Sequence, residues 1–256
     1  MASFTFHHPA NKIANVLVYL TLLSGNIYST FGVDHGQESK YLSYITPAPW
    51  TFLIWTVIHF LLGGMIVYQF FNDKLYDAVS WHFVWISIIN SIWLALWTSD
   101  HTIFALIAMF FVVGGVSNVY YGLKKTHAAD TLCETLFLHL PFSLYHAWSF
   151  VLFLVNAFAV VSPVKENGPT TFQSVLAVLG LALIVGIVIG YIEYGKVGSL
   201  AMGWYLFGVF AKQQNPIIHW TSLGFGVFVV LYTLKPFIAK AIGRGQTGGE
   251  SAPLLG

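Results

Sequence analysis

The chain has 256 residues, of which 57% are hydrophobic and only 8% are charged, and its formal net charge is +1. Ordinary soluble domains are about 25% charged, so this composition excludes a soluble globular domain and indicates a multi-pass membrane protein. The nearly neutral balance gives no reason to expect nucleic acid as a partner. The single cysteine, Cys133, excludes an intrachain disulfide and a metal site built from several cysteines.

Apolar runs along the chain predict an all-α fold, a polytopic membrane helix bundle of about eight transmembrane helices. A helix needs about 20 apolar residues to cross the hydrocarbon. The first run is expected to serve as the targeting signal, since no basic segment and cleavage site precede it. The expected spans are 12–32, 49–71, 80–98, 102–123, 134–161, 171–192, 198–211 and 217–240.

Basic residues predict the orientation of these spans. Eight crossings place both termini and three loops on one side of the membrane. That side carries Lys12, Lys74, Lys124, Lys125, Lys196, Lys235, Lys240 and Arg244, whereas the other carries Lys40, Lys165 and Lys212. The positive-inside rule therefore places both termini in the cytoplasm. A re-entrant seventh segment would leave almost no charge bias, so the pattern favours a true crossing.

Aromatic and polar side chains form stripes on three of the expected helices. The second span begins with Pro47 and Trp50, since proline suits a first helical turn and tryptophan the membrane boundary, and it continues with Trp55 and His59. The third carries Asn90, Trp93 and Trp97, and the fifth carries Tyr145, Trp148 and Asn156. Polar groups at depth face the bundle interior, so the amides are either interhelical links or fixing points in one aromatic cavity. Pro141 is expected to kink the fifth helix and free a carbonyl near Phe137.

Other chemistries have less support. His139 and His146 share a face, which keeps a haem-bearing electron carrier as a lesser alternative, but no matched pair lies at equal depth on another helix. No lysine lies mid-span, which excludes a retinal Schiff base. No carboxylate lies near the middle of a span, which weakens the case for a proton-coupled transporter. No nucleophile–base constellation or metal spacing stands out, so we expect neither an enzyme nor a resident metal or cofactor.

These residues resemble the TspO/MBR family of tryptophan-rich sensory and translocator proteins, also called peripheral benzodiazepine receptor-like. The second helix of that family starts with Pro and Trp, matched by Pro47-Ala48-Pro49-Trp50. Its third helix carries Asn-x-x-Trp, as in Asn90-Ser91-Ile92-Trp93, and its fifth carries Tyr-x-x-Trp with Asn eight residues on, as at Tyr145, Trp148 and Asn156. The seventh span, with Gly203-Trp204-Tyr205-Leu206, is similar to a longer, eight-span branch of the family.

The resemblance implies a five-helix core over residues 12–161, followed by three additional transmembrane helices over 162–242. It also implies an inward aromatic pocket for tetrapyrroles such as porphyrin or haem, for sterols or for aromatic drugs, covered by the loop Val33 to Thr46. His59 stands where the family has tyrosine, a departure expected to alter ligand choice or to add an iron contact. The segments 1–11 and 243–256 are expected to be cytoplasmic tails, the second disordered.

The C-terminal tail ends in a pattern that resembles the acidic dileucine sorting signal. Glu250 precedes the pair Leu254 and Leu255 by four positions. A working signal implies contact with a clathrin adaptor and delivery to a vacuolar, lysosomal or endosomal membrane, although short motifs also occur by chance.

Together these features predict an integral membrane, receptor- or sensor-like protein that binds a planar hydrophobic ligand. The alternative is a small-molecule transporter of an endomembrane. Expected partners are the lipid bilayer, the ligand, the adaptor and a second copy of the chain.

Overall fold

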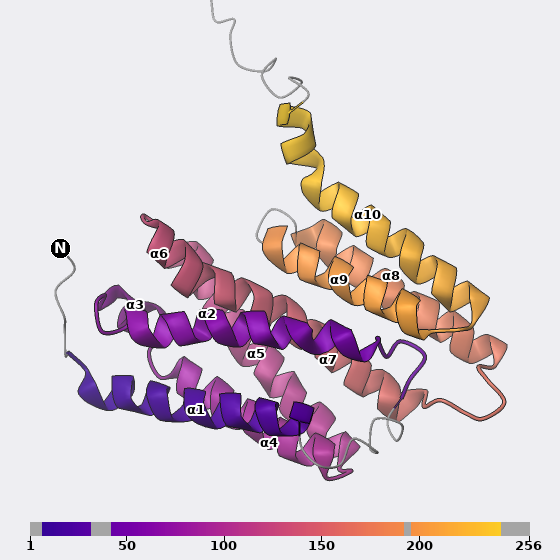
Figure 1. The fold of residues 1–256 in the computed structure, drawn as a ribbon, viewed down its shortest axis with the longest axis horizontal. Helices are drawn as coiled ribbons and strands as arrows, with labels where there is room; N and C mark the ends of the chain where they lie inside the picture. The colour runs from indigo at the N-terminus through magenta and orange to yellow at the C-terminus, as the bar shows by residue number, and fades with distance from the viewer. Residues whose placement is uncertain (1–6, 32–41, 192–195, 242–256) are drawn as a thin grey trace, which may run out of the picture.

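The computed structural model describes residues 7–31, 42–191 and 196–241, and these ranges fold as an all-α bundle (Figure 1). This confirms the predicted fold class. The helices are α1 (Pro9–Phe31), the 3-10 helix η2 (Pro49–Leu53), α2 (Ile54–Tyr68), α3 (Lys74–Val79), α4 (His82–Thr98), α5 (Thr102–Thr126), α6 (Leu132–Glu134), the π-helical turn η3 (Thr135–His139), α7 (Leu140–Val161), α8 (Thr171–Tyr191), α9 (Lys196–Lys212) and α10 (Pro216–Ala241).

Every predicted span coincides with a helix, within a few residues at each end. The sequence missed α3, a short helix in the connection between α2 and α4. Among the described residues, five helices are long and apolar enough to cross a membrane: Pro49–Tyr68, Thr102–Thr126, Leu132–Val161, Thr171–Gly190 and Pro216–Ala239. The eight-crossing topology stays a prediction for α1, α4 and α9.

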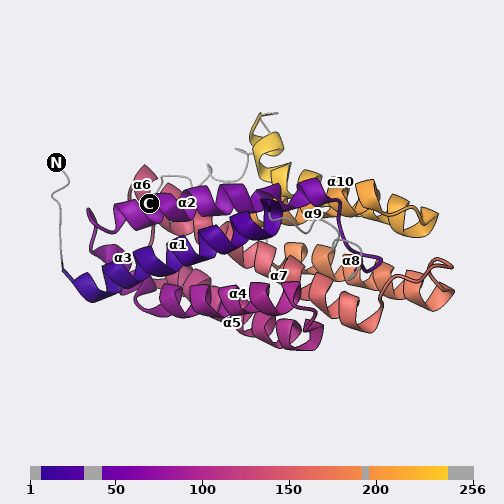
Figure 2. The same ribbon diagram turned by 60° about the horizontal axis from the view of Figure 1, so that its bottom comes forward.

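Helix α7 lies at the centre of the arrangement and contacts α2, α5 and α9 (Figures 1 and 2). On one side of it, α1 packs on α4 and α4 packs on α5; on the other, α10 packs on α8 and α9. Most of the side chains of α7 are buried, including Trp148 and Tyr145 with no exposed surface. The three C-terminal helices are therefore packed onto the core through the same helix that carries the predicted aromatic stripe.

Proline shapes two helix starts near this centre. Pro49 opens η2 at a position where its missing N–H removes no helical hydrogen bond. Pro141 follows the π turn η3, in which the Leu140 N–H donates to the Thr135 carbonyl, five residues back. A π turn of this kind accommodates a proline that cannot donate to the carbonyl four residues earlier. The structure thus has a π turn just before Pro141, within one continuous helical run, and the predicted kink stays a prediction.

A buried polar cluster closes the end of the bundle that holds Pro9. Lys12 is only 2% exposed, and its Nζ lies 3.0 Å from the carboxylate of Asp73. Asn15 donates to Gln69 at 3.1 Å, which ties α1 to the end of α2. Glu134 is likewise buried and accepts hydrogen bonds from the Asn72 amide and the Asp130 backbone N–H. The sequence placed these charges near segment ends, but gave no sign that they would be buried.

Candidate functional site

Aromatic side chains of η2 and α2 meet those of α7. The rings of Trp55 and His59 stack with centroids 5.3 Å apart, which confirms that they share a face of α2. Trp55 meets Tyr145 edge-on at 5.6 Å, and Phe52 meets Trp148 edge-on at 5.8 Å. The predicted stripes of the second and fifth spans therefore face each other across one interface.

Helix α4 turns its predicted stripe towards the same central helix. Phe83, near the start of α4, contacts the ring of Phe142, and Trp93 donates from Nε1 to Oδ1 of Asn156 at 3.1 Å. Asn90 lies between Phe83 and Trp93 on this stripe. Because Phe83 and Trp93 both contact α7, Ser87 and Asn90, which lie between them on the same face of α4, also face α7.

Several polar atoms in this region are buried without a hydrogen-bond partner among the described residues. They are both ring nitrogens of His59, both amide atoms of Asn90, the Ser87 hydroxyl, the Tyr145 hydroxyl and Nε1 of Trp148. These side chains are at most 5% exposed. Polar groups buried in a protein almost always have a partner, so such a concentration on α2, α4 and α7 is unusual.

The remaining predicted site residues are placed elsewhere or are already paired. Trp50 is 39% exposed and packs edge-on against Trp204 of α9, so it lies outside the α2–α7 interface. Pro47 is buried in the segment before η2, and Trp97 is half-buried at the edge of the core. Asn156 accepts from Trp93 and donates to the Leu152 carbonyl at 2.7 Å, which makes it an interhelical link.

Of the two candidate haem histidines, His146 contacts α5 rather than α2. His146 is joined to Ser117 of α5 by a 2.8 Å hydrogen bond at Nε2, and its ring stacks on Tyr120 at 4.7 Å. Its neighbour Tyr145 faces α2, so the two successive residues contact opposite helices. His139 lies in η3, and its Nε2 has no partner among the described residues.

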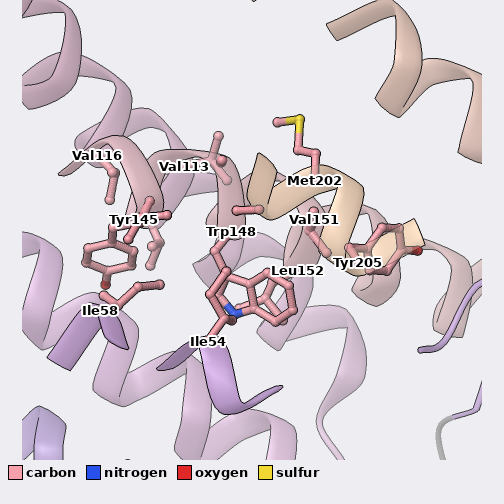
Figure 3. Close-up of a cluster of buried hydrophobic side chains, with 14 of the residues drawn as sticks. Ile54, Ile58, Val113, Val116, Tyr145, Trp148, Val151, Leu152, Met202 and Tyr205 are labelled. Atoms are coloured by element: carbon pink, nitrogen blue, oxygen red, sulfur yellow. The ribbon is translucent and has the colours of Figure 1, made fainter. Parts of the chain in front are cut away.

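Sequence reasoning missed three residues that the structure adds to this region. Phe52 and Ser87 each lie three residues before a predicted site residue, so helical spacing alone identifies them in retrospect. Tyr205 of α9 is fully buried and lies in the same cluster as Trp148, Val151 and Leu152 (Figure 3). Residues 33–41 of the predicted covering loop, and Glu250, Leu254 and Leu255, lie outside the described residues.

Comparison with known proteins gives one match. A family model described as TSPO-like protein matches residues 12–235. No curated protein and no solved structure matches the chain. The family match begins inside α1 and ends inside α10, and it includes the buried residues on α2, α4 and α7. This chain therefore belongs to the TSPO-like protein family of helical membrane proteins.

Proposed function

We propose that this protein is a membrane receptor that binds a planar, hydrophobic ligand of the porphyrin or haem type between α2, α4 and α7. Its family membership and apolar helices establish a multi-pass membrane protein in contact with the bilayer. Beyond this, we propose the position of the site, the class of its ligand and that the protein does not catalyse a reaction.

The observation that carries this proposal is the set of unpartnered polar atoms on His59, Ser87, Asn90, Tyr145 and Trp148. Each buried polar group without a partner costs about 1–3 kcal/mol. A ligand that reaches these atoms recovers that free energy, and the adjoining rings of Phe52 and Trp55 offer flat surfaces for stacking. The combination favours a ligand that is both planar and polar at its edge.

The residue types also narrow the ligand chemistry. Nε1 of Trp148 only donates, so it suits a carboxylate or another acceptor, whereas Asn90 both donates and accepts. A neutral His59 accepts a pyrrole N–H at one nitrogen, and the same nitrogen is able to bind the iron of haem. A sterol has one hydroxyl and no aromatic face, so it satisfies only one of these groups. The site therefore fits a tetrapyrrole better than a sterol.

Titration with protoporphyrin IX, followed by the Soret absorbance of the purified protein, tests the proposal. Asn90→Ala and Trp148→Phe each remove polar atoms from the site, and we expect each to weaken binding about tenfold, the effect of about 1.4 kcal/mol. Asn26→Ala is the matched control, because Asn26 is a buried amide that bonds the Leu22 carbonyl within α1. Unchanged affinity for protoporphyrin IX in both variants would contradict the assignment of Asn90 and Trp148 to the binding site.

Two alternatives give different results in the same preparations. A transporter moves substrate across proteoliposomes, whereas a receptor binds ligand stoichiometrically without flux. A haem-bearing electron carrier shows a Soret band as purified from haem-replete cells, before any ligand is added. The hydrogen bond between His146 and Ser117 leaves Nε2 of His146 engaged with protein, which favours the receptor over fixed haem ligation at that residue.

We further propose that the protein resides in an endosomal, lysosomal or vacuolar membrane with both termini in the cytoplasm. The basic-residue count and the motif of Glu250, Leu254 and Leu255 support this location. An adaptor reads such a motif only on the cytosolic side, so the location depends on the orientation.

A further inference from the structure

We infer that α9 is the positioning element of the ligand site, and that Trp204 and Tyr205 of α9, with Gln213 just after it, control the rate at which ligand enters and leaves. This inference rests on the proposed function and extends it to the C-terminal helices. It concerns the segment of residues 42–53, here called the mouth segment, which precedes α2 and includes η2.

The mouth segment is fastened to α9 by hydrogen bonds along its length. The Gln213 side-chain amide, just after α9, donates to the Thr46 carbonyl at 2.8 Å and to the Ser43 carbonyl at 3.3 Å. The Tyr205 hydroxyl donates to the Ile45 carbonyl at 2.7 Å, and Nε1 of Trp204 donates to the Thr51 carbonyl at 2.9 Å. Three side chains of one helical region therefore satisfy four carbonyls of a segment that has little regular structure.

Close backbone approach adds a further constraint. The Ala48 N–H donates to the Gly208 carbonyl at 2.9 Å. A Cβ at Gly208 would overlap the side chain of Thr51, lying 2.8 Å from its Cγ2 and nearer still to its Oγ1. Glycine is needed at position 208 because the mouth segment lies directly on the α9 backbone.

The loop after α7 holds the start of the mouth segment from its other side. Ser43 and Pro163 form an antiparallel bridge, and the Val164 N–H donates to the Leu42 carbonyl at 2.9 Å. The Lys165 N–H donates to the Tyr44 hydroxyl at 3.1 Å. The mouth segment is thus held between this loop and α9.

The far end of the mouth segment reaches the proposed site. Phe52 belongs to η2 and its ring contacts Trp148, whose Nε1 has no partner among the described residues. Tyr205 and Met202 of α9 also lie in the buried cluster around Trp148 (Figure 3). Moving the mouth segment away from α9 would therefore move Phe52 and uncover Trp148.

The test measures protoporphyrin IX association and dissociation by stopped flow on the full chain. Tyr205→Phe removes one hydroxyl, Trp204→Phe keeps an aromatic ring at a half-exposed position, and Gly208→Ala displaces Thr51. We expect each variant to raise the dissociation rate about tenfold, Trp204→Phe and Tyr205→Phe through a lost hydrogen bond and Gly208→Ala through the displacement of Thr51. We also expect faster amide hydrogen exchange in peptides from residues 42–53, with no change in helix content.

Two matched controls separate positioning from general packing. Tyr68→Phe removes a hydroxyl that accepts from Asn72 at the opposite end of the bundle, and Gly224→Ala adds a methyl group where nothing lies within 4 Å. Both are expected to keep wild-type ligand rates and wild-type exchange of residues 42–53.

The outcomes are distinct for the two proposals. A wild-type protein that binds no porphyrin overturns the proposed function and this inference with it. Wild-type binding with unchanged ligand rates in all three α9 variants overturns this inference alone, whatever happens to hydrogen exchange. Faster exchange and faster dissociation in those variants, with unchanged controls, support it.

Discussion

The buried amides of Asn90 on α4 and Asn156 on α7 differ in their hydrogen bonding. Asn156 makes hydrogen bonds to Trp93 and to the Leu152 carbonyl, whereas both polar atoms of Asn90 lack a partner among the described residues. The sequence left two interpretations open, an interhelical link and a ligand contact. The structure supports the first for Asn156, and Asn90 is the amide for which the second is proposed.

A double-mutant cycle tests the link between Trp93 and Asn156. Trp93→Phe and Asn156→Leu each remove one partner of the hydrogen bond, and the coupling free energy is expected to be about 0.6 kcal/mol, the average for such bonds between membrane helices. Unfolding of the single and double variants in detergent micelles measures it. A coupling free energy of zero would show that the pair does not link α4 to α7.

At the scale of whole elements, the π turn η3 sets the contact between α2 and the start of α7. A wider turn directs Phe137 towards Gly64 of α2, where an added Cβ would lie 3.3 Å from Cγ of the ring and nearer to two other ring carbons. Glycine at position 64 thus permits α2 to approach the π turn.

Gly64→Ala is therefore expected to destabilise the protein by about 1–3 kcal/mol, the usual cost of overpacking a core. The thermal unfolding midpoint in detergent measures the effect. Gly114→Ala serves as the control, because nothing lies within 4 Å of a Cβ at that position on α5. Equal midpoints for the two variants would mean that Phe137 moves aside without cost.

Much of the arrangement of elements was predictable from the sequence, and the reasons for the rest are physical. Apolar length identifies the helices, and helical spacing places Trp55 with His59 on one face. Spacing says nothing about contacts between distant segments, so the pairing of Trp50 with Trp204 and the attachment of the mouth segment to α9 were not foreseen. Helical spacing also does not show which polar groups pair with each other, such as Lys12 with Asp73.

At the scale of the whole molecule, the predicted orientation is testable with the protein's only cysteine. Cys133 is exposed at α6, on the side predicted to be cytoplasmic. In sealed vesicles with the cytoplasmic face outward, we expect a membrane-impermeant maleimide to label Cys133 without detergent. The variant Cys133→Ser with Glu166→Cys, in the loop after α7, should react only after detergent is added. The reverse pattern would contradict the topology and the proposed adaptor contact.

The attachment of the mouth segment to α9 also has a consequence for the order in which the protein is made. Trp204 and Gln213 are separated from their carbonyl partners by 153 to 170 residues of chain. Because α2 and α7 precede α9 in the chain, they are synthesised before the side chains of α9 that bond the mouth segment. The proposed site therefore reaches its final form only after α9 has been made and has packed against the mouth segment.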